Sequence, residues 1–154
     1  MLSNLSPHFT YNEAIASSTA KQKNLDNSPG TDELFAMFYT ASKMEQVRRI
    51  LGDKAIRINS WYRSPNLNAA VGGSKTSQHM KGEAVDFTCP SAGTPVDICK
   101  KLISSGISFD QLIYEHSWVH ISFKNPDGQN RKQVITLVNG KYVSGITDKQ
   151  GKEL

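Results

Sequence analysis

Two short segments with alternating apolar and polar residues constrain this fold most, because each pattern fits a β-strand that is buried on one side only. The first spans residues 84–87 and the second residues 118–123. Their apolar positions are Val85 and Phe87 in the first and Val119, Ile121 and Phe123 in the second. We therefore predict two strands that share a core and that present Asp86 and His120 from their polar faces.

A third residue of the same chemical kind precedes the first strand. His79 lies seven residues before Asp86, and Gly82 between them permits a sharp turn of the chain. Two imidazoles and one carboxylate are a ligand set of catalytic zinc, which leaves a fourth position for water or substrate. A single histidine near a strand is more often hydrogen-bonded than metal-bound, so the hypothesis depends on the combination. We predict that His79, Asp86 and His120 bind one Zn²⁺.

The spacing of these residues also resembles the sequence pattern of a known family. The first segment reads Ser77-x-His79-x-x-Gly82-x-Ala84-x-Asp86 and the second contains Trp118-Val119-His120. This pattern is similar to that of the zinc D-Ala-D-Ala carboxypeptidase family, whose members include phage endolysins that cut peptidoglycan peptides. The run from Trp61-Tyr62-Arg63-Ser64-Pro65 to Val71-Gly72-Gly73-Ser74 resembles the same family, and the resemblance covers roughly residues 5–123.

The resemblance implies an α+β fold in one compact domain, with a small, mainly antiparallel sheet, helices packed around it and the zinc site on the sheet. A length of 154 residues agrees with a single domain over residues 1–154. Within it we expect the metal-binding core at about residues 55–123 and a C-terminal hairpin at about residues 133–145. We also expect a monomer.

Composition limits the partners and the location. The net charge of +4 and the pI of about 9.1 favour a polyanion, either nucleic acid or the anionic bacterial wall. The basic residues are scattered, and no nucleic-acid recognition motif is present, so we expect a peptidoglycan peptide and no nucleic acid. No apolar run suits a membrane span, and residues 1–8 lack the features of a secretion signal. We therefore expect a cytoplasmic protein without a membrane partner, which as an endolysin would be released from the host cytoplasm to the wall.

Capping signals predict the helices. A capping box, Thr10-x-x-Glu13, predicts a short helix over about residues 12–17, and Ser64-Pro65 and Thr94-Pro95 each predict another. A long helix is predicted from about residue 32 to a cap at Gly52. Its predicted inward residues are Leu34, Phe38, Ala41, Val47 and Leu51.

Further strands are predicted from alternation and turn residues. They cover residues 55–61 and 111–115, and the C-terminal hairpin has Asn139-Gly140 in a type I′ turn. The last eight residues are predicted to form a frayed polar tail. Cys89 and Cys99 lack the CxxC spacing of a zinc site, and the sequence leaves open whether the fold brings them together.

Peptide hydrolysis at a zinc site also needs a group that moves the proton from water to the leaving amine, and Glu115 is our candidate. It ends the predicted strand before His120, from which a tight turn at His116 would bring it to the metal. Two alternatives stay open, namely His116 and Glu83. Strand parity places Glu83 on the face away from the ligands, so we expect it to be a solvated surface residue.

Four residues are candidates for substrate contact. Arg63, at a predicted strand-to-helix junction, can offer a bidentate guanidinium to a substrate carboxylate or to the developing oxyanion. Ser77 is predicted to hydrogen-bond the substrate or to hold a ligand. Tyr62 and Trp118 are predicted to line the cleft, with simple packing as the alternative.

Together the residues and the resemblance imply a zinc metallopeptidase of peptidoglycan stem peptides, of the phage endolysin type, acting as an endopeptidase or a carboxypeptidase. The alternative is a zinc-stabilised domain of the same fold without turnover, which binds the cell wall or belongs to the virion.

Overall fold

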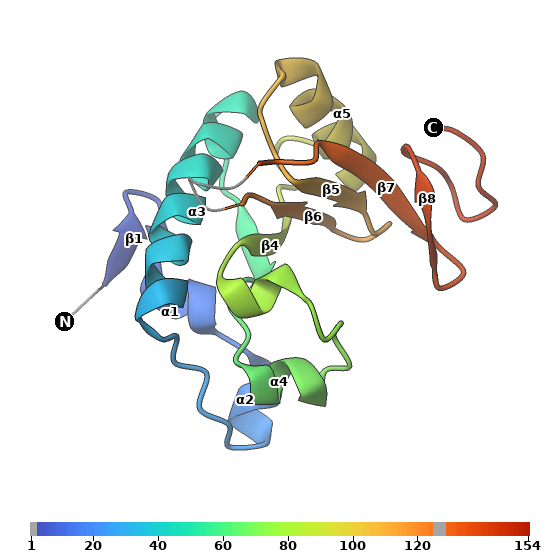
Figure 1. Cartoon of the computed structure of the whole chain (residues 1–154). Coiled ribbons are helices and arrows are strands. Elements are labelled where there is room, and N and C mark those ends of the chain that lie inside the picture. Colours follow the sequence, from blue (N-terminus) through green and yellow to red (C-terminus); the bar gives the residue numbers. More distant parts are fainter. Residues whose placement is uncertain (1–2, 125–128) are drawn as a thin grey trace.

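The computed structural model describes residues 3–124 and 129–154 (Figure 1). Its first half contains β1 (Asn4–Ser6), β2 (Phe9–Thr10), α1 (Tyr11–Ile15), α2 (Ser18–Gln22), α3 (Thr31–Ile50), β3 (Arg57–Ser60), α4 (Pro65–Ala70) and the 3-10 helix η1 (Gln78–Lys81). The second half contains β4 (Ala84–Thr88), α5 (Pro95–Ser105), β5 (Gln111–Tyr114), β6 (Val119–Ser122), β7 (Gln133–Val138) and β8 (Lys141–Ser144). Residues 1–2 and 125–128 of the predicted domain lie outside the described residues.

The main sheet has six strands in the order β3-β4-β6-β5-β7-β8. Neighbouring strands are antiparallel, except that β5 and β7 are parallel. The long helix α3 stands on one side of the sheet, α5 packs near β5 and β6, and the β7–β8 hairpin extends the sheet on the opposite side (Figure 1). The predicted α+β fold with a mainly antiparallel sheet is confirmed.

The predicted strand parity is confirmed by the hydrophobic core. The core contains the five apolar residues of the two alternating segments, which are Val85, Phe87, Val119, Ile121 and Phe123. Met37, Met44 and Val47 of α3 belong to the same core. Burial of each large apolar side chain contributes about 1.5–3 kcal/mol, so the alternating pattern determines which face of the sheet points inward.

The prediction for one residue of the long helix is wrong. Phe38 is 36% exposed, whereas Ala41 and Val47 are buried as predicted. Met37, one position before Phe38, is fully buried, as is Met44, so these two methionines lie on the inward face of α3 in place of Phe38. One residue is about 100° of rotation around a helix, which is enough to turn Phe38 toward the solvent.

The local signals predicted the ends of the elements well. The capping box at Thr10 is present, and Thr94 forms a second one with Asp97. Asn139 and Gly140 have φ values of 49° and 77°, as a type I′ turn requires. These elements form as predicted because each of their signals is a hydrogen bond or a dihedral preference within a few residues of chain.

The C-terminal residues are not frayed as we predicted. The backbone N–H of Thr147 donates to Thr136 Oγ1 at 3.0 Å, and that of Leu154 donates to the Ile146 carbonyl at 2.9 Å. Thr147 also forms a bridge with Glu153. Polar composition did not reveal this, because the stabilising bonds come from the backbone and from a hydroxyl on β7.

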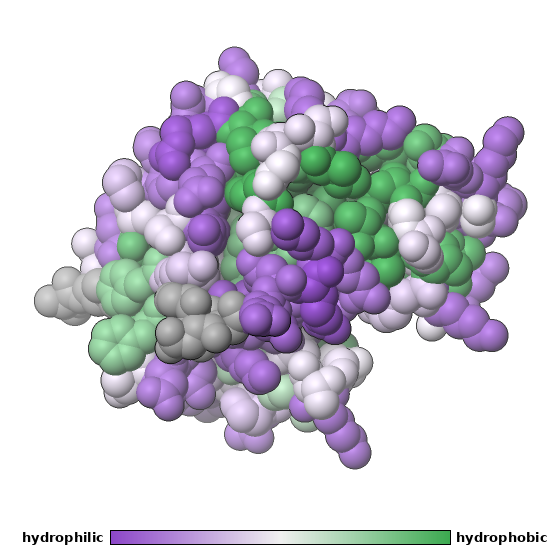
Figure 2. All heavy atoms as spheres, turned by 45° about the horizontal axis from the view of Figure 1, so that its top comes forward, coloured by the Kyte–Doolittle hydropathy of each residue, from purple (hydrophilic) through white to green (hydrophobic). Residues whose placement is uncertain are grey.

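The two cysteines are free thiols in the interior. Cys89 and Cys99 are both buried, and burial raises the pKa of the Cys99 thiol to about 12. Within the described residues, no helix has the length and apolar character needed to cross a membrane. Figure 2 shows one face of the surface, largely hydrophilic, with apolar residues gathered in its upper part.

Candidate metal centre

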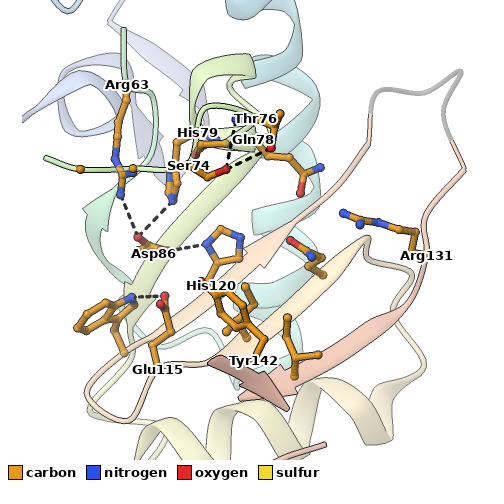
Figure 3. A pocket seen from close by; sticks show the side chains of 17 residues that line it. Arg63, Ser74, Thr76, Gln78, His79, Asp86, Glu115, His120, Arg131 and Tyr142 are labelled. Atoms are coloured by element: carbon orange, nitrogen blue, oxygen red, sulfur yellow. Dashed lines mark hydrogen bonds and ion pairs between the residues drawn. The ribbon is translucent and has the colours of Figure 1, made fainter. Parts of the chain in front are cut away.

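A row of paired residues across the sheet forms the floor of a cleft. Asp86 of β4 lies opposite His120 of β6, which is paired with Ile113 of β5, which in turn is paired with Ile135 of β7. All four residues line the same cleft of about 450 Å³. Figure 3 shows Asp86 and His120 side by side in it. Paired residues of neighbouring strands project from the same face, so the sheet itself holds Asp86 beside His120.

The short helix η1 brings His79 to these two residues. Ser77 caps the helix, and its Oγ accepts a hydrogen bond from the His79 backbone N–H at 3.2 Å. The His79 ring donates from Nδ1 to the Trp61 carbonyl at 2.6 Å, which leaves Nε2 free to face Asp86 Oδ2 at 3.2 Å. A ring nitrogen that donates to a carbonyl fixes the tautomer in which the other nitrogen can bind a metal.

Gly82 supplies the sharp turn that joins η1 to β4. Its φ of 76° is in the left-handed region, and its carbonyl accepts hydrogen bonds from Thr40 Oγ1 at 3.0 Å and Trp61 Nε1 at 3.2 Å. A Cβ atom at this position would lie 2.7 Å from the Glu33 carbonyl oxygen and from Met37 Cγ of α3. The turn therefore needs a glycine for two reasons, the backbone conformation and the close approach of α3.

We expect Gly82→Ala to lower the free energy of unfolding by at least about 2 kcal/mol, because the left-handed strain and the clash with the α3 backbone add together. Urea unfolding measures the change. Gly72→Ala is a matched control, since its φ is 72° but a Cβ there would meet nothing within 4 Å. Equal losses in both variants would show that contact with α3 plays no part.

The three residues fit a zinc ion by the chemistry of their donor atoms. One ligand atom from each of His79, Asp86 and His120 lies within 4.8 Å of the others. Burial lowers the pKa of His79, which favours the neutral, metal-binding imidazole. Burial raises the pKa of Asp86, but the adjacent His120 and His79 outweigh this effect and hold the pKa well below its usual value. Two imidazole nitrogens and one carboxylate oxygen suit Zn²⁺ with one open position.

Arg63 lies beside this group, at the predicted junction between β3 and α4. Its Nη2 is 3.7 Å from Asp86 Oδ2, while Nε donates to Ser60 Oγ and Nη1 to Asn68 Oδ1, both at 3.3 Å. Asn68 is itself held by a hydrogen bond from its Nδ2 to the Ser74 carbonyl at 2.8 Å. The guanidinium thus has a defined position next to the metal ligands (Figure 3).

Glu115 reaches the cleft through the tight turn that its position required. His116 has a φ of 65°, and the Glu115 N–H donates to the Trp118 carbonyl at 3.1 Å. Trp118 Nε1 donates to Glu115 Oε2 at 2.8 Å, which orients the carboxylate (Figure 3). Burial and the negative charge of Asp86 raise the pKa of Glu115. A raised carboxyl pKa suits a group that must both accept and release a proton near neutral pH.

The two alternatives to Glu115 lie outside the cleft lining. His116 donates from Nε2 to the Leu137 carbonyl at 2.7 Å, and its ring contacts the Tyr114 ring in a tilted arrangement. The expectation that Glu83 is a solvated surface residue is wrong, since it is 6% exposed and accepts a hydrogen bond from Gln78 Nε2. The face away from Asp86 is the covered face of the sheet, so the parity that removes Glu83 from the site also buries it.

The other predicted contact residues differ in whether they line the cleft. Ser77 and Trp118 line the cleft, whereas Tyr62 is 5% exposed and belongs to the hydrophobic core. The Tyr62 backbone N–H donates to the Ala14 carbonyl, because the chain has left β3 here and packs against α1. The structure therefore does not support the predicted contact of Tyr62 with substrate.

Several residues of the cleft were not predicted from the sequence. They are Gln78, Gln111, Arg131 and Tyr142. Arg131 and Tyr142 come from the segment around the C-terminal hairpin, which the turn signal predicted correctly. That signal is local, so it did not show that β7 would pair with β5 and place the hairpin at the wall of the cleft.

Comparisons with known proteins agree with this geometry. A family model described as Peptidase M15 matches residues 7–122, which include the three metal-ligand candidates, Arg63 and Glu115. The zinc D-Ala-D-Ala carboxypeptidase of Streptomyces albus G is 41% identical over 54 residues, or 35% of this chain. The matched segment spans 21% of that relative. Arg131 and Tyr142 lie beyond the family match.

Proposed function

Because this chain belongs to the peptidase M15 family, we propose that it is a zinc-dependent peptidase that hydrolyses peptide bonds in the stem peptides of bacterial peptidoglycan. The observation that carries the proposal is that the three ligand candidates, Arg63 and Glu115 line one cleft. The substrate class is supported by the matched relative, whose name gives D-Ala-D-Ala as its substrate.

In the proposed reaction His79, Asp86 and His120 would hold the metal, which would supply Lewis-acid polarisation of the scissile carbonyl. Glu115 accepts a proton from the attacking water and then donates it to the leaving amine. The hydrogen bond from Trp118 holds the carboxylate in position between these steps. The reaction therefore depends on one carboxylate that stays outside the metal ligand set.

Arg63 binds charge on the substrate in this proposal. Its guanidinium is held by Ser60 and Asn68 and faces the cleft near Asp86. A planar guanidinium in a fixed position can form two parallel hydrogen bonds with a carboxylate, or can stabilise the developing oxyanion.

We expect Arg63→Lys to keep the zinc but to lose about 10- to 100-fold in kcat/KM, because lysine is a point charge that cannot form the bidentate contact. Elemental analysis and kinetics on a defined peptide measure the two properties. Arg57→Lys is the control, since Arg57 is exposed on β3 and lies outside the cleft lining. Unchanged hydrolysis would assign Arg63 to a salt bridge with Asp86 alone.

Mass analysis of defined muropeptides after incubation with the zinc-loaded protein tests the proposed function directly. Cleavage products are expected, and their masses identify the bond that is cut. Binding of muropeptides without cleavage would instead indicate a zinc-stabilised domain that binds the wall or belongs to a virion.

We further propose that the protein acts as a wall-lysing enzyme of the phage endolysin type. The net charge of +4 supports this, since it favours approach to an anionic cell wall. A fall in turbidity of bacterial wall suspensions is expected on addition of the zinc-loaded protein, with its rate decreasing as the salt concentration rises. Cleavage of soluble muropeptides without lysis of walls would limit the activity to free peptides.

A further inference from the structure

Arg131, which lies just before β7, lines the cleft on the side away from Arg63. Figure 3 shows the two arginines on opposite sides of the group formed by His79, Asp86 and His120, with the Arg131 guanidinium pointing toward the cleft. Half of the Arg131 side chain is exposed, so a bound molecule can reach it. The cleft therefore has a cationic group on each side of the candidate metal centre.

A fully buried carboxylate holds Arg131 in place. Asp110 accepts hydrogen bonds from the Arg131 backbone N–H at 2.9 Å, from Nε at 3.0 Å and from Nη2 at 2.7 Å. The Asp110 side chain is 0% exposed. Two hydrogen bonds to one edge of the guanidinium determine the direction of its plane, so Arg131 is preorganised before any substrate arrives.

The remaining edge of this guanidinium is available to a ligand. Asp110 occupies the edge formed by Nε and Nη2, and Nη1 has no hydrogen-bond partner in the described parts of the chain. A guanidinium has five N–H donors, so the edge formed by Nη1 and Nη2 can still bind a second carboxylate in a bidentate manner.

We propose that Arg131 is a specificity-determining residue that binds a side carboxylate of an acidic peptide substrate, on the opposite side of the metal centre from the charge bound by Arg63. The inference rests on the proposed function and narrows its substrate class. In a stem peptide, D-glutamate carries a free carboxylate that can fill this position, whereas D-isoglutamine carries an uncharged amide there. The protein should therefore prefer the peptide with D-glutamate.

A purely structural role makes a different prediction. The Asp110–Arg131 pair also joins the starts of β5 and β7, where the Gln133 backbone N–H donates to the Asp110 carbonyl at 2.9 Å. If the pair served only to join these two strands, its removal would weaken the hydrolysis of charged and amidated peptides equally. The ratio of the two rates separates the two roles.

The test compares kcat/KM for two peptides that differ only in D-glutamate or D-isoglutamine. The wild type is expected to prefer the carboxylate by about tenfold, the scale of one charge-assisted contact. Arg131→Gln is expected to lose this preference and to change the rate for the amidated peptide much less. Lys132→Gln, the neighbouring exposed cation outside the cleft lining, controls for net charge and should keep the preference.

A second variant guards against misfolding, because Arg131→Gln leaves the buried Asp110 carboxylate without its cation. Asp110→Asn combined with Arg131→Gln replaces the ion pair by a neutral, hydrogen-bonded pair and should give the same loss of preference. An unchanged preference in both variants would overturn the inference.

If the wild type cleaves neither peptide, the proposed function fails. Calorimetric affinities of the two peptides for the zinc-loaded protein and the same variants then decide the role of Arg131.

Discussion

Asp86→Ala is expected to lower zinc affinity by more than about a hundredfold and to abolish peptide hydrolysis, and His79→Ala and His120→Ala should do the same. Loss of an outer partner of a metal ligand already costs about 10- to 100-fold in affinity, so loss of a ligand should cost more. Asp86 lies between the two histidines, with Oδ1 2.8 Å from His120 Nδ1 and Oδ2 3.2 Å from His79 Nε2. Its removal therefore takes away the one negatively charged ligand of the site.

Elemental analysis after dialysis, together with competition against a chelator, measures zinc binding in these variants, and circular dichroism verifies that each is folded. His8→Ala is a matched control, because His8 is exposed and pairs with Glu45 away from the cleft. It should retain full zinc and full activity. Wild-type zinc occupancy in all three ligand variants would refute the assignment of the metal centre.

Glu115→Gln is expected to keep zinc and fold but to lose at least about a hundredfold in kcat, the usual scale for removal of a general base. Glutamine has nearly the same shape as glutamate, and its amide oxygen can still accept the hydrogen bond from Trp118. It cannot accept the proton of the attacking water. A loss of rate with intact metal content would therefore isolate the proton-transfer step from metal binding and from packing.

Two further variants identify the base if Glu115 is not the one. His116→Ala and Glu83→Gln should change kcat only mildly, since neither residue lines the cleft. If His116→Ala is inactive while Glu115→Gln still turns over, the base is misassigned and the proposed metallopeptidase function remains. If the wild type itself cleaves no muropeptide, a zinc-bearing binding domain becomes the better description.

The fold was predictable from the sequence where its signals are local or periodic. Alternation in residues 84–87 and 118–123 predicted two strands, the faces that they bury and the projection of Asp86 and His120 from the polar faces. The pairing of β4 with β6 then places these two residues opposite each other. Gly82 between His79 and Asp86 predicted the turn that the structure contains. The capping boxes and the Asn139-Gly140 turn followed from interactions within about four residues of chain.

Errors arose where the side of an element that packs depends on distant residues. The inward face of α3 was predicted from its spacing of apolar residues, yet several spacings fit, and Phe38 was assigned to the wrong side. Glu83 was predicted to be solvated because strand parity turns it away from the ligands, and Tyr62 was predicted to line the cleft because it stands next to Arg63 in the family-like segment. Burial of these two side chains depends on which neighbours cover them, and no local pattern records that.

The sequence alone determined the set of chemical groups at the candidate metal centre. The three ligand candidates lie on or beside two strands, and the alternation of apolar and polar residues in these strands predicts which side chains share a face. Only the tertiary structure decided the shape of the cleft around them. The wall of the cleft away from Arg63 depends on the parallel pairing of β5 with β7. This pairing brings Arg131 to Asp110, although β5 and β6 lie between them in the chain, and it places Tyr142 at the cleft. Such a pairing is selected by the burial of the whole sheet, so neither strand carries a local signal for it.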